Sequence, residues 1–224
     1  MSQSKNYLMK PADDPNTDYR ALVQRGYDRC AAEYDQARQE EGHPELALLT
    51  DRLDEGASVL DIGCGAGIPV ARTLAQRFQV TGIDLSIAMI ERARVNVPEA
   101  AFIHSDIMGA QFPSAHFEAV VSFYAIFHLP REEHPELFHR IHRWLKDGGY
   151  FLATVADTNE APYMEDDFFG VTMYWSNFGL KEYQQLLTEI GFRLLDISVV
   201  GHGYRADEEP SEEHHPLIFA QKIG

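Results

Sequence analysis

The sequence predicts an α/β fold, a doubly wound and mostly parallel sheet of seven strands with one antiparallel strand beside its edge. Short apolar runs alternate with helical segments from residue 58 onward, a glycine-rich turn follows the first run, and no helical segment separates the last two runs. The chain has 224 residues, 45% of them hydrophobic. This length supports one well-buried core but is short for two full domains. We therefore expect a sheet domain over 55–224, preceded by an N-terminal helical cap over 1–54.

The N-terminal cap is expected to consist of a loosely ordered segment followed by a helix. Residues 1–16 are polar and contain two prolines, so we expect them to be loosely ordered. Apolar residues then recur every three or four positions over 17–34, which predicts a helix with Thr17 or Asp18 as its N-cap. A second, shorter helix is expected over 44–53.

The alternation that follows defines most of the sheet. Buried strands of a parallel sheet read as short, nearly continuous apolar runs, and the intervening segments have helical spacing. Ser86 is expected to cap the helix that it precedes, and the Asp147-Gly148-Gly149 turn is expected to stop the helix before it. On this basis strands are predicted at 58–63, 79–85, 100–106, 117–125 and 149–156, and helices at 68–78, 86–96 and 131–145.

The alternation breaks at residues 157–178, which are aromatic and acidic and show no clean period. We expect this segment to form an aromatic lid or insert. A helix is predicted at 180–192, with a glycine stop, and strands at 193–201 and 215–222 complete the sheet. About a dozen residues without a helix join these two strands, so they should run antiparallel.

A glycine-rich turn joins the first strand to the first helix, in the sequence VLDIGCGAG at 59–67. Glycines allow a tight turn and close approach of the backbone to a ligand. Asp84 ends the next strand, where a carboxylate can accept both hydroxyls of a ribose. The fingerprint of nicotinamide dinucleotide sites requires a third glycine where this chain has Ile68, so a nicotinamide-dependent oxidoreductase is only an alternative.

The glycine turn, preceded by Asp61, resembles the first motif of class I S-adenosylmethionine-dependent methyltransferases. The segments 80–94, 102–109, 117–129 and 144–154 resemble the second to fifth motifs of that family, in the same order. The resemblance implies a Rossmann-like methyltransferase fold with S-adenosylmethionine as cofactor. It implies a ribose contact for Asp84, a contact with the adenine amino group for Asp106, and a cofactor carboxylate contact for the tyrosines of a YDxxAxxYD stretch. The cofactor residues implied are Tyr27, Tyr34, Asp61, Gly63, Cys64, Gly65, Gly67, Asp84, Leu85, Met89, Asp106, Ile107, Phe123 and His128.

The acceptor should lie beyond the carboxyl ends of the strands, at the edge where ligands bind in open parallel sheets. A histidine there could remove a proton from a hydroxyl acceptor. His128 is the first candidate base, with His202 and His215 behind it, although His128 could instead only pack against the cofactor. These histidines could also bind a metal with His214 and Asp157, but no pair has the helical spacing of a zinc enzyme, and no metal is predicted. Candidate acceptor-binding residues are Tyr124, Tyr163, Phe169, Tyr174, Trp175 and His214.

Composition limits the kind of partner. The net charge of −16 disfavours nucleic acid and anionic membrane surfaces, and Ser122-Phe123-Tyr124-Ala125 does not resemble the motifs of nucleic acid methyltransferases. Cys30 and Cys64 are interpreted as free thiols, and no apolar run approaches eighteen residues, so we expect a cytoplasmic protein. We expect it to be a monomer or a homodimer. The expected reaction is methyl transfer from S-adenosylmethionine to a small molecule, at oxygen rather than nitrogen or carbon, with release of S-adenosylhomocysteine. The remaining alternative is a protein that binds the cofactor without catalysis.

Overall fold

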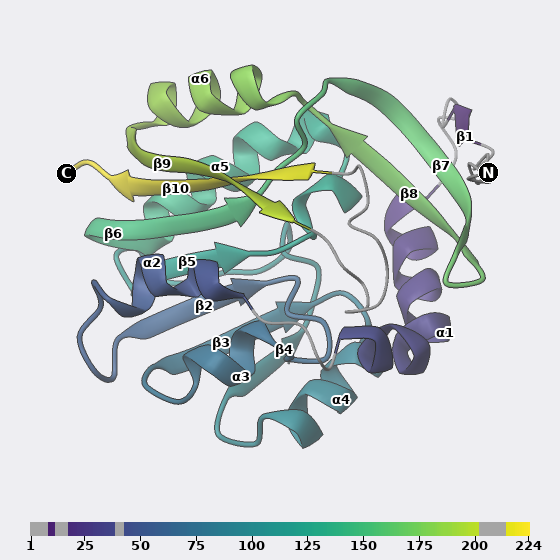
Figure 1. Cartoon of the computed structure of the whole chain (residues 1–224), viewed down its shortest axis with the longest axis horizontal. Coiled ribbons are helices and arrows are strands. Elements are labelled where there is room, and N and C mark those ends of the chain that lie inside the picture. The colour runs from purple at the N-terminus through teal and green to yellow at the C-terminus, as the bar shows by residue number, and fades with distance from the viewer. Residues whose placement is uncertain (1–8, 12–17, 39–42, 202–213) are drawn as a thin grey trace.

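The main sheet of this computed structural model has seven strands in the order β4-β3-β2-β5-β6-β10-β9 (Figure 1). The structure describes residues 9–11, 18–38, 43–201 and 214–224. The strands from β2 to β6 pair in parallel, and β10 pairs antiparallel with both β6 and β9, so the predicted sheet is confirmed. The strands are β2 (Ser58–Ile62), β3 (Gln79–Asp84), β4 (Ala101–His104), β5 (Phe117–Ser122), β6 (Leu145–Thr154), β9 (Phe192–Gly201) and β10 (His214–Lys222).

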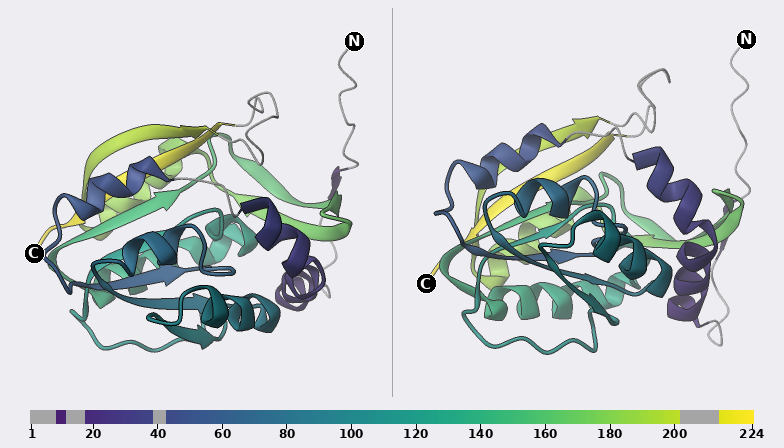
Figure 2. Two further views of the ribbon diagram at one scale, coloured as in Figure 1. Left: turned by 60° about the horizontal axis from the view of Figure 1, so that its bottom comes forward. Right: turned by 90° about the horizontal axis from the view of Figure 1, so that it is seen from below.

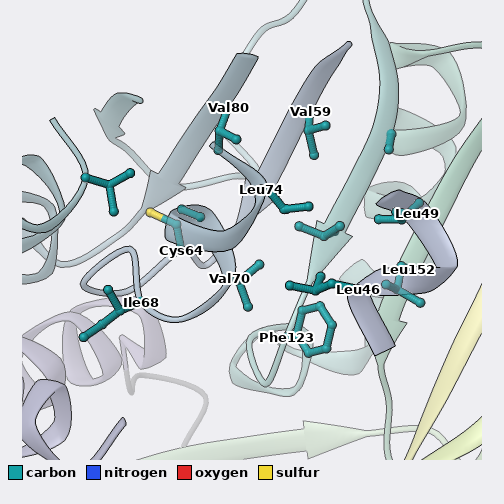
Figure 3. Close-up of a cluster of buried hydrophobic side chains, with 14 of the residues drawn as sticks. Leu46, Leu49, Val59, Cys64, Ile68, Val70, Leu74, Val80, Phe123 and Leu152 are labelled. Carbon is teal, nitrogen blue, oxygen red and sulfur yellow. The ribbon is translucent and has the colours of Figure 1, made fainter. Parts of the chain in front are cut away.

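Helices cover both faces of the sheet, as the two views of Figure 2 show. One face carries the turn η1 (Pro44–Leu46) with α2 (Ala47–Thr50), α3 (Val70–Leu74) and α4 (Ile87–Asn96). The other carries α5 (His134–Trp144) and α6 (Leu180–Ile190). Alternate residues of each strand enter the two cores, and Figure 3 shows the first core, where Leu46, Leu49 and Leu74 pack on Val59 and Leu152. This apolar burial on both faces explains the nearly continuous apolar runs of the strands.

Several predicted helix ends are confirmed. The Ser86 side chain caps α4 by accepting a hydrogen bond from the Met89 amide at 3.2 Å. At the start of α1 (Tyr19–Arg38), the Asp18 carboxylate accepts from the Ala21 amide at 3.0 Å. Gly191 ends α6 in the left-handed conformation.

The helix α1 is longer than predicted because polar contacts dock it on α4. Asp28 Oδ1 accepts hydrogen bonds from the Ser86 hydroxyl at 2.6 Å and from the Ala88 amide at 3.2 Å. One residue beyond the predicted end, Asp35 pairs with Arg92 at 2.9 Å. These contacts place α1 across the carboxyl ends of the parallel strands. In Figure 1 the arrowheads of β5 and β6 point toward the side of the molecule on which α1 lies.

The segment 157–178 forms a second sheet, which the sequence did not predict. Its strands are β7 (Glu160–Phe168) and β8 (Val171–Asn177), and residues expected to be loose contribute a third, β1 (Met9–Pro11), which pairs antiparallel with β7. The hairpin turns at Phe169 and Gly170, which have φ of 48° and 75°. β8 is mostly buried, so it lacks the alternation of apolar and polar residues that identifies a half-buried strand.

The strand β6 corrects another expectation. The helix predicted to stop at Asp147-Gly148-Gly149 ends at Trp144, and β6 begins at Leu145 and runs through these glycines. Gly148 has φ of 78°, and the register with β5 shifts at this position. An irregular strand can therefore carry residues that otherwise stop a helix.

Candidate active site

A pocket of about 800 Å³, including open space at its mouth, lies at the carboxyl ends of β2, β3 and β5 and beneath α1. We call it the main pocket. A side pocket of about 420 Å³ adjoins it, since Tyr34, Gly63, Gly65 and Phe123 line both. The predicted cofactor residues that line the main pocket are Tyr27, Tyr34, Gly63, Gly65, Asp84, Leu85, Met89, Asp106, Ile107, Phe123 and His128.

The glycine turn leaves space for a ligand. Gly63 has φ of 70°, and a Cβ atom there would lie 2.2 Å from the Cβ of Ala125. Gly65 has φ of 51°, and a Cβ there would meet nothing within 4 Å, because it would point into open space. Gly67 lines neither pocket; a Cβ there would meet Val97 and Phe102, so this glycine allows the turn to pack on the core.

Asp84 ends β3 beside this turn. Its Oδ2 accepts from the Gly65 amide at 2.9 Å, and its Oδ1 accepts from the Ser86 amide at 2.8 Å. Burial raises the pKa of the carboxyl, and these two hydrogen bonds oppose the rise. Each carboxylate oxygen has a further lone pair, so the fixed carboxylate can still accept hydrogen bonds from ligand hydroxyls.

The side pocket holds acidic and basic side chains. Asp61 is 2% exposed, its Oδ2 has no hydrogen-bond partner, and burial, followed by the charge of Asp84, raises its pKa to about 7. Arg38 lines the same pocket, with its guanidinium over the rings of Tyr34 at 5.3 Å and Tyr124 at 5.0 Å. A buried carboxyl and a guanidinium in one small pocket suit the two ends of a free amino acid group. Cys64 also lines this pocket, and its thiol is buried.

Asp106 lies at the other end of the main pocket, following β4. Its Oδ1 accepts from the Met108 amide at 2.9 Å, and its Oδ2 accepts from Arg20 Nε at 2.7 Å. Arg20, on α1, also pairs with Glu133. Apolar side chains of Leu85, Met89 and Ile107 complete this end of the pocket.

Sequence reasoning missed Arg20 and Arg38. The only signal was that Arg38 follows Tyr27 and Tyr34 at helical spacing, so that all three share one face of α1.

His128 and Tyr27 form a hydrogen-bonded pair at the edge of the main pocket. Tyr27 Oη lies 2.7 Å from His128 Nε2, and His128 Nδ1 lies 2.9 Å from the Tyr174 carbonyl oxygen. Because a carbonyl only accepts, Nδ1 carries the proton, and Nε2 accepts the hydrogen bond from the Tyr27 hydroxyl. Burial lowers the pKa of His128 to about 4, so the ring is neutral at physiological pH.

The predicted acceptor residues divide between the pocket and the second sheet. Tyr124 lines the main pocket, with φ of 56° at the end of β5. Trp175 packs on His128 at 4.3 Å between ring centroids. The Tyr174 ring stacks on Tyr19 at 4.2 Å, so its backbone rather than its ring reaches His128. Phe169 packs on Tyr34 at 5.4 Å, and Tyr163 lies on β7 opposite Trp175.

The remaining histidines are only partly described. His215 packs on Tyr124 and Phe127, each at 5.5 Å between ring centroids. His214 begins β10, but its side chain lies outside the described residues, as does all of His202. Within the described ranges, no group of three or more histidine, cysteine or acidic side chains is arranged to hold a metal ion. In the same ranges, no helix is long and apolar enough to cross a bilayer.

Comparisons with known proteins show that the chain is similar to methyltransferases. Residues 59–149 match a family model described as a methyltransferase domain. The chain is 29% identical to the phosphoethanolamine N-methyltransferase of Plasmodium falciparum, over 65% of this chain and 58% of that protein. It is 32% identical to phosphoethanolamine N-methyltransferase 3 of Arabidopsis thaliana, over 64% and 31%. The chain thus spans between about a third and three fifths of these curated relatives.

Solved structures show the same fold. The crystal structure of 1,6-didemethyltoxoflavin-N1-methyltransferase from Burkholderia thailandensis, with its substrate and S-adenosylhomocysteine bound, superposes with a TM-score of 0.73. The alignment covers 100% of this chain and 99% of that one at 20% identity. These findings confirm the predicted Rossmann-like fold and the resemblance to class I S-adenosylmethionine-dependent methyltransferases. They favour a methyltransferase over the alternative of a nicotinamide-dependent oxidoreductase.

Proposed function

We propose that this chain, which carries a class I methyltransferase domain, transfers a methyl group from S-adenosylmethionine to an oxygen of a small organic acceptor. The observation that carries the proposal is the continuity of the two pockets with the Tyr27–His128 pair. A nucleoside end and an amino acid end can bind on either side of the glycine turn, with a proton acceptor beside them. S-adenosylhomocysteine would be the second product.

The pocket residues fit this cofactor at both ends. When bound, S-adenosylmethionine supplies a methyl group on a positively charged sulfur. Asp84 would accept the ribose hydroxyls, and Asp106 would accept from the adenine amino group. The unpartnered Oδ2 of Asp61 would accept from the ammonium group, while Arg38 would hold the carboxylate.

Tyr27 and His128 would remove the proton of the acceptor. As the acceptor oxygen attacks, its proton moves to Tyr27 Oη, and the hydroxyl proton of Tyr27 moves to His128 Nε2 along the 2.7 Å hydrogen bond. The Tyr174 carbonyl fixes the tautomer in which Nε2 is free to receive it. The imidazolium formed in this buried position loses its proton again readily, because burial disfavours the charged ring.

We further propose that α1 and the β7–β8 hairpin act together as a cover for the site. Tyr19 on α1 stacks on Tyr174 of β8, and Tyr27 packs against Phe168 of β7 at 6.0 Å. A cover of this kind excludes water from the reacting atoms and positions the acceptor. This proposal assigns a role to the expected cap over 1–54 and to the insert over 157–178.

Transfer to nitrogen is the second candidate, because the curated relatives are named as N-methyltransferases. An amine acceptor also loses a proton on methylation, and the same two residues could take it.

The test compares turnover with cofactor affinity in Tyr27→Phe and His128→Ala. If the pair accepts the proton, kcat falls by about 10²- to 10⁴-fold, while the Kd for S-adenosylhomocysteine changes by no more than about threefold. His139→Ala removes an exposed histidine of α5 and is the matched control. Equal losses in kcat and cofactor affinity would assign the pair a packing role, and mass spectrometry of the product distinguishes oxygen from nitrogen methylation.

A further inference from the structure

Arg20 links three elements at the end of the main pocket that the proposed function assigns to adenine. Its Nε donates to Asp106 Oδ2 at 2.7 Å, and its Nη2 donates to Glu133, the last residue of the turn η3 (Arg131–Glu133). Arg20 and Asp106 both line the pocket, whereas Glu133 does not. The three side chains are 38%, 32% and 30% exposed, so the group lies at the rim of the pocket.

Local helix stability does not explain why these charges meet. Arg20 occupies the first turn of α1, where the helix dipole disfavours a cation. Glu133 occupies the N-cap position of α5, yet its side chain makes no capping hydrogen bond there. Ion pairs with this degree of exposure contribute little to the free energy of unfolding. The position of the group beside the pocket therefore indicates a role in ligand binding.

The pairing fixes both oxygens of the Asp106 carboxylate. Oδ1 accepts from the Met108 amide at 2.9 Å, and Oδ2 accepts from Arg20. The last torsion of an aspartate side chain is broad, so a single hydrogen bond would leave the carboxylate free to turn. Glu133 holds the guanidinium in its turn, since the planar fork of an arginine can donate to two carboxylates at once. The lone pairs that remain on Asp106 are thus held in fixed directions at the pocket wall.

We propose that Arg20 is a positioning residue that makes the site selective for adenine over bases without its exocyclic amino group, such as hypoxanthine. The inference rests on the proposed function, in which Asp106 accepts from that amino group. A carboxylate only accepts hydrogen bonds, so it attracts the amino group of adenine and repels the carbonyl oxygen that hypoxanthine has in the same place. The repulsion is strong only if the carboxylate cannot turn away, and Arg20 prevents that turn.

The experiment measures the Kd of two ligands for the full chain by isothermal titration calorimetry. S-adenosylhomocysteine carries adenine, and S-inosylhomocysteine differs from it only in carrying hypoxanthine. The wild type should bind S-inosylhomocysteine about 10- to 150-fold more weakly, which is the range for a lost hydrogen bond to a charged group.

Arg20→Met keeps the length of the side chain and removes the guanidinium. The ratio of the two Kd values should fall by at least about twofold, which is the lower end of the coupling between directly paired residues. Arg77→Met is the matched control. Arg77 Nε also donates to a carboxylate, that of Glu55 at 3.2 Å, but both residues precede the strands β2 and β3 and so lie at the amino ends of the sheet. This control should leave both Kd values unchanged.

Asp106→Ala tests whether Arg20 acts through Asp106. The ratio of the two Kd values should fall in this variant, and adding Arg20→Met to it should cause no further change. A further change in the double variant would mean that Arg20 contacts the base itself, and it would overturn the positioning role.

The outcomes separate the inference from the proposed function. If S-adenosylhomocysteine does not bind to the wild type, the proposed function fails and the inference fails with it. If it binds, but the wild type binds S-inosylhomocysteine equally well, only the inference is overturned. The same holds if Arg20→Met keeps the wild-type ratio.

Discussion

The pH dependence of cofactor binding should follow the ionisation of Asp61. Its carboxyl is fully buried, and its pKa is about 7 where an ordinary aspartate has 3.8. If the carboxylate receives the ammonium group of the cofactor, only the ionised form binds. Below pH 7 the ionised fraction falls tenfold per pH unit, so the affinity at pH 5 should be about a hundredfold below its value at pH 8.

The ionisation of the same carboxyl lowers the stability of the free protein as the pH rises, whereas it raises the affinity for the cofactor. Its pKa is higher in the folded protein than in the unfolded chain, so the folded state binds the proton more tightly. The stabilisation from this group is fully present below about pH 4 and is lost as the pH rises to about 7, at a cost of roughly 4 kcal/mol. From pH 5 to 8, this contribution lowers the melting temperature of the free protein, while the rise in melting temperature caused by S-adenosylhomocysteine increases.

Asp61→Asn keeps the shape of the side chain and removes its titration. The variant loses a hydrogen bond to a charged group, worth about 1.5–3 kcal/mol, so its affinity at pH 8 should fall by about 10- to 150-fold. At pH 5, where the wild-type carboxyl is mostly protonated, the two proteins should bind with similar affinity. The variant's pH profile should be nearly flat.

Isothermal titration calorimetry with S-adenosylhomocysteine between pH 5 and 8 measures both effects. Repeating the titration at pH 6 in two buffers of different ionisation enthalpy counts protons, and the wild type should release nearly one per ligand bound. A wild-type affinity that is flat across this range, or a variant that keeps the wild-type slope, would refute the role given to Asp61.

Three further predictions concern the same edge of the sheet. Gly63→Ala should cost at least about 2 kcal/mol in urea unfolding, because its Cβ would lie 2.2 Å from that of Ala125 at a positive φ; Gly65→Ala, which meets no atom, should cost less, and equal costs would contradict this account. Asp84→Ala should abolish most of the thermal shift caused by S-adenosylhomocysteine, and an unchanged shift would exclude the ribose role. Asp28→Ala removes two hydrogen bonds to the start of α4 and should lower the free energy of unfolding by about 1–2 kcal/mol; no change would mean that α1 is held by other contacts.

The parts of the site that could be predicted from the sequence are those that depend on neighbouring residues. The glycine turn lies in the connection from β2 to α3, and the acid that ends β3 and the cap at Ser86 lie in the connection from β3 to α4. Short motifs reflect backbone geometry in such strand–turn–helix connections. The antiparallel position of β10 also followed from local information, since the sequence between the last two apolar runs shows no helical pattern.

The parts that could not be predicted depend on distant residues. Arg20 meets Asp106 across 86 positions of the chain, and Asp35 meets Arg92 across 57. No short motif encodes such pairs. The hairpin β7–β8 was missed for a related reason, because burial of β8 against α1 and against the turn that carries His128 removes its period of two.

The contacts of α1 also have a consequence for the order in which the protein is made. The helix is synthesised early, but its partners come later: Ser86 and Arg92 first, then Asp106, and finally Tyr174 on β8. During translation, about 140 further residues must therefore be synthesised after α1 before Tyr174, the last of these partners, is made. A nascent chain stopped before β8 would have paired the parallel strands β2 to β6 but would leave their carboxyl ends and the first helix exposed to chaperones and proteases.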